Sequence, residues 1–362
     1  MSTPPNVEQL AAWLDALTPL GGLSGHEYPV RAYLAEALRP WADALHTDPP
    51  GNLIARFGPE DAAHRLAVLA HMDTVGLMVK QISPEGVLRV VQVGGVNVRA
   101  LPGAAVEIWE APTSADVPRL PGVAGVIGVR SQHLSRSAEP PPSVETLYVQ
   151  IAPEDVARVR VTAPVTYAPQ RVRQGAHLYS SPHLDNRAGC AALLALGQWL
   201  GQNGVPTPDT AIYLVGTVQE ETTCAGALHA LRNVQPQAAL FVDGTLSYDT
   251  PETRGRGAVR LGAGPVLSAF LYVSGLNGWH ADPHLRARLR GLAEARGIPH
   301  QEDAIRGLMS DARAALWAGV PSALVGVPMR GKHAPLETVH LGDLAHAVQL
   351  LTAAVAAFGE EM

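Results

Sequence analysis

The sequence has few cysteines, few charged residues and no long apolar run, and each of these shortages excludes a class of protein. Cysteine occurs only as Cys190 and Cys224, too few for a disulfide framework or a thiolate metal site, which favours a reducing compartment. Charged residues make up 17 % with a net charge of −6 and no basic block, so neither a nucleic-acid partner nor a membrane patch is expected. No apolar run approaches the ~20 residues of a membrane span, and the acidic start does not resemble a signal peptide. We therefore expect a cytoplasmic protein.

Apolar residues are plentiful, at 47 % of 362 residues, which predicts about two domains with cores of their own. Residues 7–45 have apolar positions at helical spacing around a glycine turn and predict two helices. Short apolar runs at 52–57 and 66–69 predict buried strands. From about residue 77 to 173, short β-branched runs alternate with glycine and proline, which indicates a small β-barrel or sandwich.

An alternation of helices and strands returns after Tyr179. Helices are expected at 187–200, 225–232, 284–296, 311–318 and 342–357, and strands at 211–218, 239–242 and 322–327. The economical architecture is a discontinuous α/β domain, residues 1–76 and 174–362, interrupted by an all-β, barrel-like insertion at 77–173.

Potential metal ligands follow four of the predicted strands, where open α/β sheets place their sites. Those at the strand ends are His71, Asp73, Glu220, Glu221, Asp243 and His333. Each one alone is more typical of a cap or a turn, but together they are harder to explain structurally. Imidazole and carboxylate suit divalent metals such as zinc, and two ions sharing a carboxylate need about five mixed ligands. The set that would supply them is His71, Asp185, Glu221, Asp243 and His333.

The adjacent carboxylates Glu220 and Glu221 need an explanation of their own, because like charges near a core repel each other. A metal relieves the repulsion if one carboxylate binds it while the other moves a proton between water and a leaving amine. The structural alternative is a solvated acidic turn. Asp73, two residues after His71, could orient that imidazole.

Several motifs occur in an order that resembles one family. They are AHMDTVGLMV, HLDNRAGC, VQEETTCAGA, VDGT and KHAPLE. This order, over nearly the whole chain, is similar to that of the tetrahedral (glutamyl/deblocking) aminopeptidases, a family of dinuclear metallopeptidases. The chain departs from the family pattern at Thr222–Cys224, where a glycine is usual, and at Ala334, where serine is usual.

The resemblance implies a role for each matching residue. Asp185 would bridge two ions, Glu220 would be the general base and acid, and Asp73 would support His71; the remaining ligands would be His71, Glu221, Asp243 and His333. It also implies a zinc-peptidase-like α/β sandwich with the inserted barrel. Dimers formed through that insertion could build a tetrahedral dodecamer.

The function expected on these grounds is removal of N-terminal residues from peptides by water activated between two divalent ions, zinc first, with cobalt or manganese also compatible. A related di-zinc amidohydrolase or carboxypeptidase is an alternative with similar ligands. A glycoside hydrolase using a carboxylate pair without metal is a second, and a non-catalytic assembly protein is a third. The preferred N-terminal side chain is left open.

Overall fold

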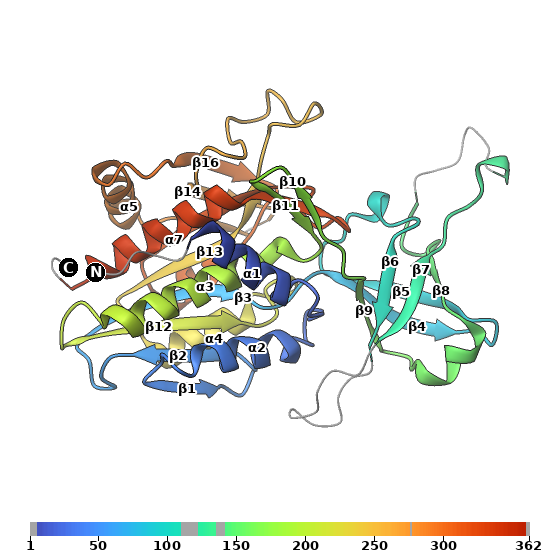
Figure 1. The fold of residues 1–362 in the computed structure, drawn as a ribbon, viewed down its shortest axis with the longest axis horizontal. Helices are drawn as coiled ribbons and strands as arrows, with labels where there is room; N and C mark the ends of the chain where they lie inside the picture. Colours follow the sequence, from blue (N-terminus) through green and yellow to red (C-terminus); the bar gives the residue numbers. More distant parts are fainter. Residues whose placement is uncertain (1–5, 110–121, 135–141, 276, 360–362) are drawn as a thin grey trace.

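The computed structural model describes residues 6–109, 122–134, 142–275 and 277–359. Its strands form two separate units, a 12-stranded mixed sheet and a closed six-stranded barrel. Figure 1 shows the barrel at one end of the molecule, beside the sheet and its helices. The expected combination of an α/β domain and an inserted all-β barrel is therefore confirmed.

Four parallel strands form the centre of the large sheet, in the order β12, β3, β13, β17. Their bounds are β3 His64–His71, β12 Thr210–Thr217, β13 Ala238–Leu246 and β17 Ser322–Arg330. Every residue of β12 is buried. Helices cover both faces of this sheet, which is why its strands are continuous apolar runs in the sequence.

Shorter strands extend the sheet on both sides. Antiparallel strands flank the centre at β1 Ala44–Thr47, β2 Leu53–Phe57, β10 Val172–Gln174, β11 Leu178–Ser181 and β18 Glu337–His340. A branch attached to β17 contains β14 Val266–Tyr272, β15 Gly278–His280 and β16 Gln301–Arg306. The sequence pattern did not predict this branch; β15 has only three residues, and only one residue of β16 is buried.

The helices divide between the two faces of the sheet. One apolar cluster joins it to α1 Val7–Leu17, α2 Tyr28–Leu38, α3 Leu184–Asn203, α5 Pro283–Ala295 and α7 Leu341–Ala356. A second cluster holds α4 Ala225–Val234 and α6 Ala312–Ala318. Helix α3 is buried along most of its length. A Cβ at its Gly197 would lie 2.3 Å from Leu38 Cδ2, so any larger residue there would force Leu38 to shift.

The barrel has an apolar core separate from that of the large sheet. Its strands are β4 Gly76–Ile82, β5 Val87–Val93, β6 Ala105–Ile108, β7 Val123–Ile127, β8 Tyr148–Gln150 and β9 Pro164–Tyr167. Short 3-10 turns occur at Val98–Ala100, Gln132–Leu134 and Pro153–Arg158. The domain boundaries at 76/77 and 173/174 stay a prediction.

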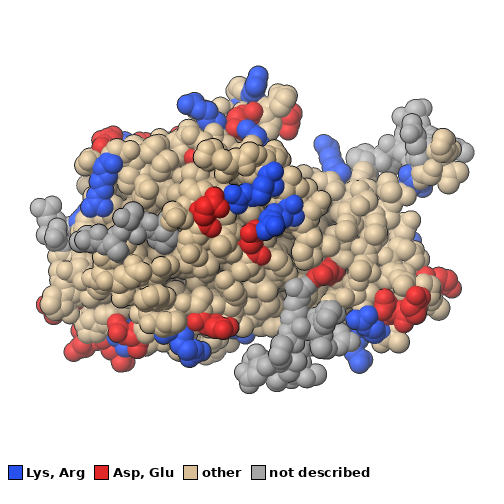
Figure 2. Space-filling view, in the orientation of Figure 1, with Lys and Arg blue, Asp and Glu red and all other residues tan. Residues whose placement is uncertain are grey.

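The surface charges are mixed. On the face in Figure 2, the described Lys and Arg side chains lie in small groups beside Asp and Glu and form no continuous basic area. Among the described helices, none combines the length and the apolar character needed to cross a bilayer.

Candidate metal centre

The residues singled out at the strand ends lie together at one edge of the large sheet. His71 is the last residue of β3 and pairs with Thr217, the last residue of β12. Glu220 and Glu221 follow β12 by three and four residues, while Asp243 lies within β13. Parallel strands end at the same edge of a sheet, so side chains distant in sequence converge there.

Asp185, near the start of α3, lies between two imidazoles. Its Oδ1 is 3.3 Å from His71 Nε2, and its Oδ2 is 3.2 Å from His333 Nε2. The side chain of Asp185 is 1 % exposed, so both oxygens are held away from water. One carboxylate thus presents a different oxygen to each histidine, which is the arrangement that a bridging ligand requires.

Each imidazole has a further carboxylate beside it. Asp243 Oδ1 is 3.4 Å from His71 Nε2, and Glu221 Oε2 is 3.4 Å from His333 Nε2. We call His71 Nε2, Asp185 Oδ1 and Asp243 Oδ1 the inner position. The outer position consists of Asp185 Oδ2, Glu221 Oε2 and His333 Nε2, and its histidine is 23 % exposed against 2 % for His71. Ligand atoms of His71, Asp185 and Glu221 also lie within 4.8 Å of one another.

Both histidines have the Nδ1 atom engaged. His333 Nδ1 lies 2.7 Å from the carbonyl oxygen of Gly95, and His71 Nδ1 lies 3.2 Å from that of Asp73. A carbonyl can only accept, so Nδ1 carries the proton and Nε2 keeps its lone pair. Such contacts orient metal-binding imidazoles in proteins.

The inserted barrel region helps to position His333. Besides Gly95, the backbone N–H of Asn97 and the hydroxyl of Tyr167 donate hydrogen bonds to the carbonyl oxygen of His333, at 3.1 and 3.3 Å. The outer position is therefore built by both units of the molecule, although its ligand atoms come from the larger one.

The donor set fits divalent cations. Asp185 Oδ1, Glu221 Oε1 and Asp243 Oδ1 are buried and accept no hydrogen bond within the described part of the chain. Burial raises the pKa of Glu220 and of Glu221 well above the ordinary value, and neighbouring carboxylates raise both further. So many desolvated oxygens in one place are costly unless cations bind them.

Asp185 differs from these two glutamates. Burial alone would raise the pKa of Asp185, but the charge of Lys332 and the neighbouring imidazoles of His333 and His71 hold it well below the ordinary value. This carboxylate is therefore ready to bind cations without losing a proton.

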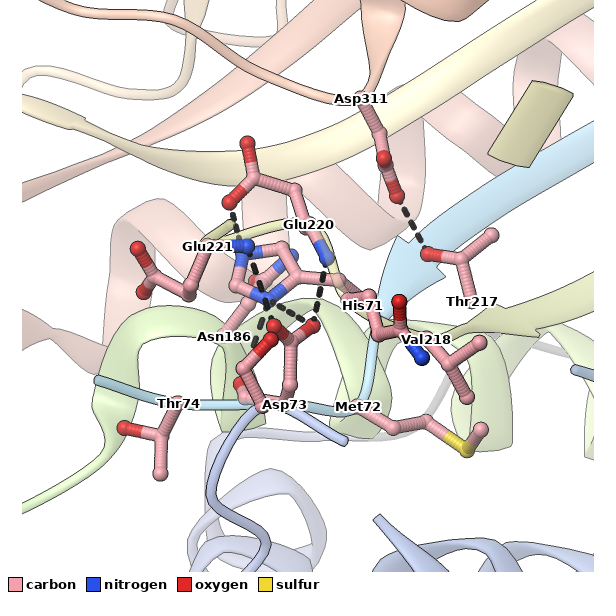
Figure 3. Close-up of polar contacts among 12 residues, drawn as sticks. His71, Met72, Asp73, Thr74, Asn186, Thr217, Val218, Glu220, Glu221 and Asp311 are labelled. Atoms are coloured by element: carbon pink, nitrogen blue, oxygen red, sulfur yellow. Dashed lines mark hydrogen bonds and ion pairs between the residues drawn. The ribbon is translucent and has the colours of Figure 1, made fainter. Parts of the chain in front are cut away.

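Asp73 anchors the loop that carries the two glutamates. Its Oδ1 accepts a hydrogen bond from the backbone N–H of Glu220 and its Oδ2 accepts one from that of Glu221, each at 3.0 Å. Figure 3 shows Asp73 beneath His71 and both glutamates. Asp73 Oδ1 is also 3.4 Å from His71 Nδ1, so the side chain predicted to support His71 is in contact with the loop as well.

Three polar residues at the site were not singled out from the sequence. Glu337 accepts hydrogen bonds from the backbone N–H of Asp185 at 2.8 Å and of His333 at 2.6 Å. Asp311 accepts one from the hydroxyl of Thr217, as Figure 3 shows. Burial raises the pKa of Glu337 and of Asp311 to about 7. The third is Lys332. Lys332 and Glu337 belong to the motif KHAPLE, which could have drawn attention to them, whereas Asp311 lies in none of the motifs quoted above.

A cleft of about 400 Å³ lies beside the centre. Its lining includes Glu220, Glu221, Lys332 and His333, and also Arg313. The centre therefore borders a space large enough for part of a peptide. Cys190 and Cys224 are buried free cysteines.

A family model covers most of the chain, and relatives and solved structures described as aminopeptidases match it. The model of the family described as M42 glutamyl aminopeptidase matches residues 51–350. The lysyl aminopeptidase of Pyrococcus furiosus is 28 % identical, over 92 % of this chain and 92 % of its own. The structure of an aminopeptidase from Desulfurococcus kamchatkensis is 29 % identical with a TM-score of 0.85, covering 97 % of this chain and 95 % of that one.

A further solved structure concerns assembly. The TET1 peptidase of Pyrococcus horikoshii, described as able to assemble into a tetrahedron or a large octahedral shell, has a TM-score of 0.81 and 27 % identity. The match covers 96 % of this chain and 99 % of that one.

Proposed function

Because this chain belongs to the M42 glutamyl aminopeptidase family and is an aminopeptidase, we propose that it hydrolyses the first peptide bond of peptides with two divalent ions. The observation that carries the proposal is the placement of Asp185, whose two oxygens each lie within 3.3 Å of a different histidine Nε2. The inner ion would be held by His71, Asp185 and Asp243. The outer ion would be held by Asp185, Glu221 and His333.

The ions would supply a Lewis acid for the scissile carbonyl and lower the pKa of the attacking water. Glu220 is the proposed general base and acid. It lines the cleft, and its Oε2 lies 4.0 Å from His71 Nε2, beside the centre rather than within either trio of ligand atoms. Its carboxylate takes a proton from the water and returns it to the leaving nitrogen. Asp73 is a positioning residue that holds the backbone of Glu220 and Glu221.

The free amino terminus of the substrate is a second recognition element in this proposal. Glu220 and Glu221 both line the cleft, so a protonated α-amino group would meet carboxylates there. A blocked terminus carries no charge and could not form this charge-assisted contact. This pairing would restrict cleavage to the first peptide bond.

Metal removal and terminal blocking together test the proposal. Dialysis against a chelator should abolish hydrolysis of free-amine peptides, and returning zinc, cobalt or manganese should restore it. The N-acetylated form of the same peptide should be cleaved at least about a hundredfold more slowly, the scale expected when a buried charged contact is lost. Release of the first residue, followed by mass spectrometry, is the measurement.

The same experiment separates the alternatives. An amidohydrolase or carboxypeptidase with this centre would tolerate the acetyl group, and a metal-free glycosidase would survive chelation. Either result would contradict the proposed aminopeptidase mechanism.

Arg313 supports a proposal on substrate preference. Its Nη1 donates a hydrogen bond to Asn277 Oδ1 at 2.8 Å, and its guanidinium lies 4.5 Å from the ring centroid of Trp317. Its Nε has no hydrogen-bond partner among the described residues. Because Arg313 lines the cleft, a carboxylate on the first substrate side chain would find a positioned cation.

We therefore expect N-terminal glutamate to be cleaved faster than leucine, and both faster than lysine. Replacing Arg313 by methionine should lower kcat/KM for the glutamyl substrate by about 10- to 100-fold, the usual loss for a charge-assisted hydrogen bond. The leucyl substrate should change little. An aminoacyl chromogenic panel measures this, with the exposed Arg290→Met as control; a preference for lysine in the unmodified enzyme would contradict it.

We extend the proposal to metal identity, assembly and location. Zinc is the first expectation for these ligands, with cobalt or manganese next. A homo-oligomer built from dimers, up to a tetrahedral dodecamer, is proposed on the likeness to the Pyrococcus horikoshii peptidase. The exposed apolar side chains Val126, Val129 and Leu134 on or near the barrel support contacts through that unit. A cytoplasmic location stays a prediction.

A further inference from the structure

Lys332 places a largely buried ammonium against the carboxylate proposed to bridge the two ions. Its side chain is 9 % exposed, and Nζ lies 2.6 Å from Asp185 Oδ2 and 3.8 Å from Asp243 Oδ1. The same Nζ donates a hydrogen bond to the carbonyl oxygen of Gly244 at 3.1 Å. The positively charged Lys332 side chain therefore lies at the place where the proposed function requires two metal cations.

The choice of lysine at this position is unusual for this chain. Of its 27 basic residues, only Lys80 and Lys332 are lysines. Lysine carries a compact point charge on a flexible stem, whereas arginine carries a planar fork that is less adaptable. A small and mobile cation is what a crowded metal centre can accommodate.

The contact distances make the two metal positions unequal. Asp185 Oδ2, the oxygen nearest to Lys332 Nζ, is also the one that faces His333 Nε2 at 3.2 Å. Lys332 and an ion at the outer position would thus draw on one oxygen and repel each other. At the inner position, Asp243 Oδ1 is more than 1 Å farther from Nζ than Asp185 Oδ2 is, and Coulomb repulsion falls with distance.

We propose that Lys332 competes with the outer ion for Asp185 Oδ2, so that the inner ion binds first and the outer ion binds more weakly and exchanges. This inference rests on the proposed two-ion function. The cleft of about 400 Å³, which Lys332 also lines, gives the displaced side chain a place to go. Lys332 is a positioning residue in this account, because it acts through the metal ligands.

Metal titration of matched variants tests the inference. Zinc or cobalt binding would be followed by calorimetry in the unmodified protein, in Lys332→Met and in Lys80→Met, the control at an exposed lysine. The unmodified protein and the control should bind two ions with affinities at least about tenfold apart. Lys332→Met keeps a side chain of similar length but removes its charge. The affinity of this variant for the second, more weakly bound ion should increase by about tenfold or more. Lys332→Arg should retain a weak second step.

Amine labelling of the unmodified protein gives a second readout that needs no variant. Acetylation of Lys332, compared with Lys80 by mass spectrometry, should increase as the second equivalent of metal is added. Unchanged metal affinities in Lys332→Met would overturn the role of Lys332 while leaving two bound ions intact. If Lys332→Met does not fold, labelling of Lys332 in the unmodified protein that does not change with added metal would overturn it instead. Failure of the unmodified protein to bind a second ion would overturn the two-ion proposal itself.

Discussion

Replacing Asp185 by asparagine should remove metal from both positions and abolish peptidase activity in a protein that stays folded. Its two oxygens lie 3.3 Å from His71 Nε2 and 3.2 Å from His333 Nε2, so this one carboxylate supplies an oxygen to each trio of ligand atoms. An amide supplies one neutral oxygen in place of two charged ones. Activity should fall by more than about a hundredfold, since even residues that only support a ligand cost about 10- to 100-fold.

Elemental analysis after dialysis is the measurement, with circular dichroism to establish folding. Asp155→Asn is a matched control, because Asp155 pairs with Arg158 at the surface, at 2.7 Å. The control should retain the metal content and the rate of the unmodified enzyme. Two tightly bound ions in Asp185→Asn would show that this carboxylate is not the bridge.

Replacing Glu220 by glutamine should have a different outcome, in which both ions remain but the rate falls by about 10² to 10⁴-fold, the range for loss of a general base. Glu220 approaches the centre only at 4.0 Å from His71 Nε2. Its amide would occupy the same volume yet accept no proton. The loss should appear in kcat more than in KM, because Glu221 still lines the cleft and can meet the substrate's α-amino group, whereas the proton transfer by Glu220 is lost.

The neighbouring residue provides the sharpest comparison. Glu221→Gln changes the same chemical group one position later, at an atom 3.4 Å from His333 Nε2, and should weaken binding of the outer ion. Metal content and rate measured together therefore assign the two roles. Full activity in Glu220→Gln, or full loss of metal from it, would contradict its role as base.

The local environment explains how two adjacent carboxylates can differ in role. Asp73 accepts one backbone N–H from each, with both hydrogen bonds at 3.0 Å. The two peptide groups are thereby fixed, and the side chains leave the loop in different directions, as Figure 3 shows. One carboxylate reaches the outer position while the other remains beside the inner histidine.

The sequence predicted the central strands well because they are buried on both faces. Such strands are continuous apolar runs, and the polar residue that ends each run is easily seen, as for His71 at the end of β3. Strands β15 and β16 of the branch were missed because one has three residues and the other is mostly exposed or half-buried, so that their pattern resembles that of loops.

The support around the centre was harder to anticipate. Glu337 and Lys332 contact Asp185 across about 150 residues of chain. No periodicity connects such positions, since contacts of this kind depend on where α3 and the loop after β17 meet. The role of Gly95 and Asn97 in holding His333 has the same origin, because the barrel must first dock against the larger unit.

By itself, the sequence determined the family, the α/β architecture with its inserted barrel, and the chemical types that cluster at the strand ends. These features follow from local residue patterns, which reflect the burial and the length of each strand. Only the tertiary structure decided which oxygen of Asp185 faces which histidine, what Asp73 holds, and that an ammonium lies against the central carboxylate. These are differences of an ångström or two between side chains from separate elements, and they are set by packing rather than by sequence spacing.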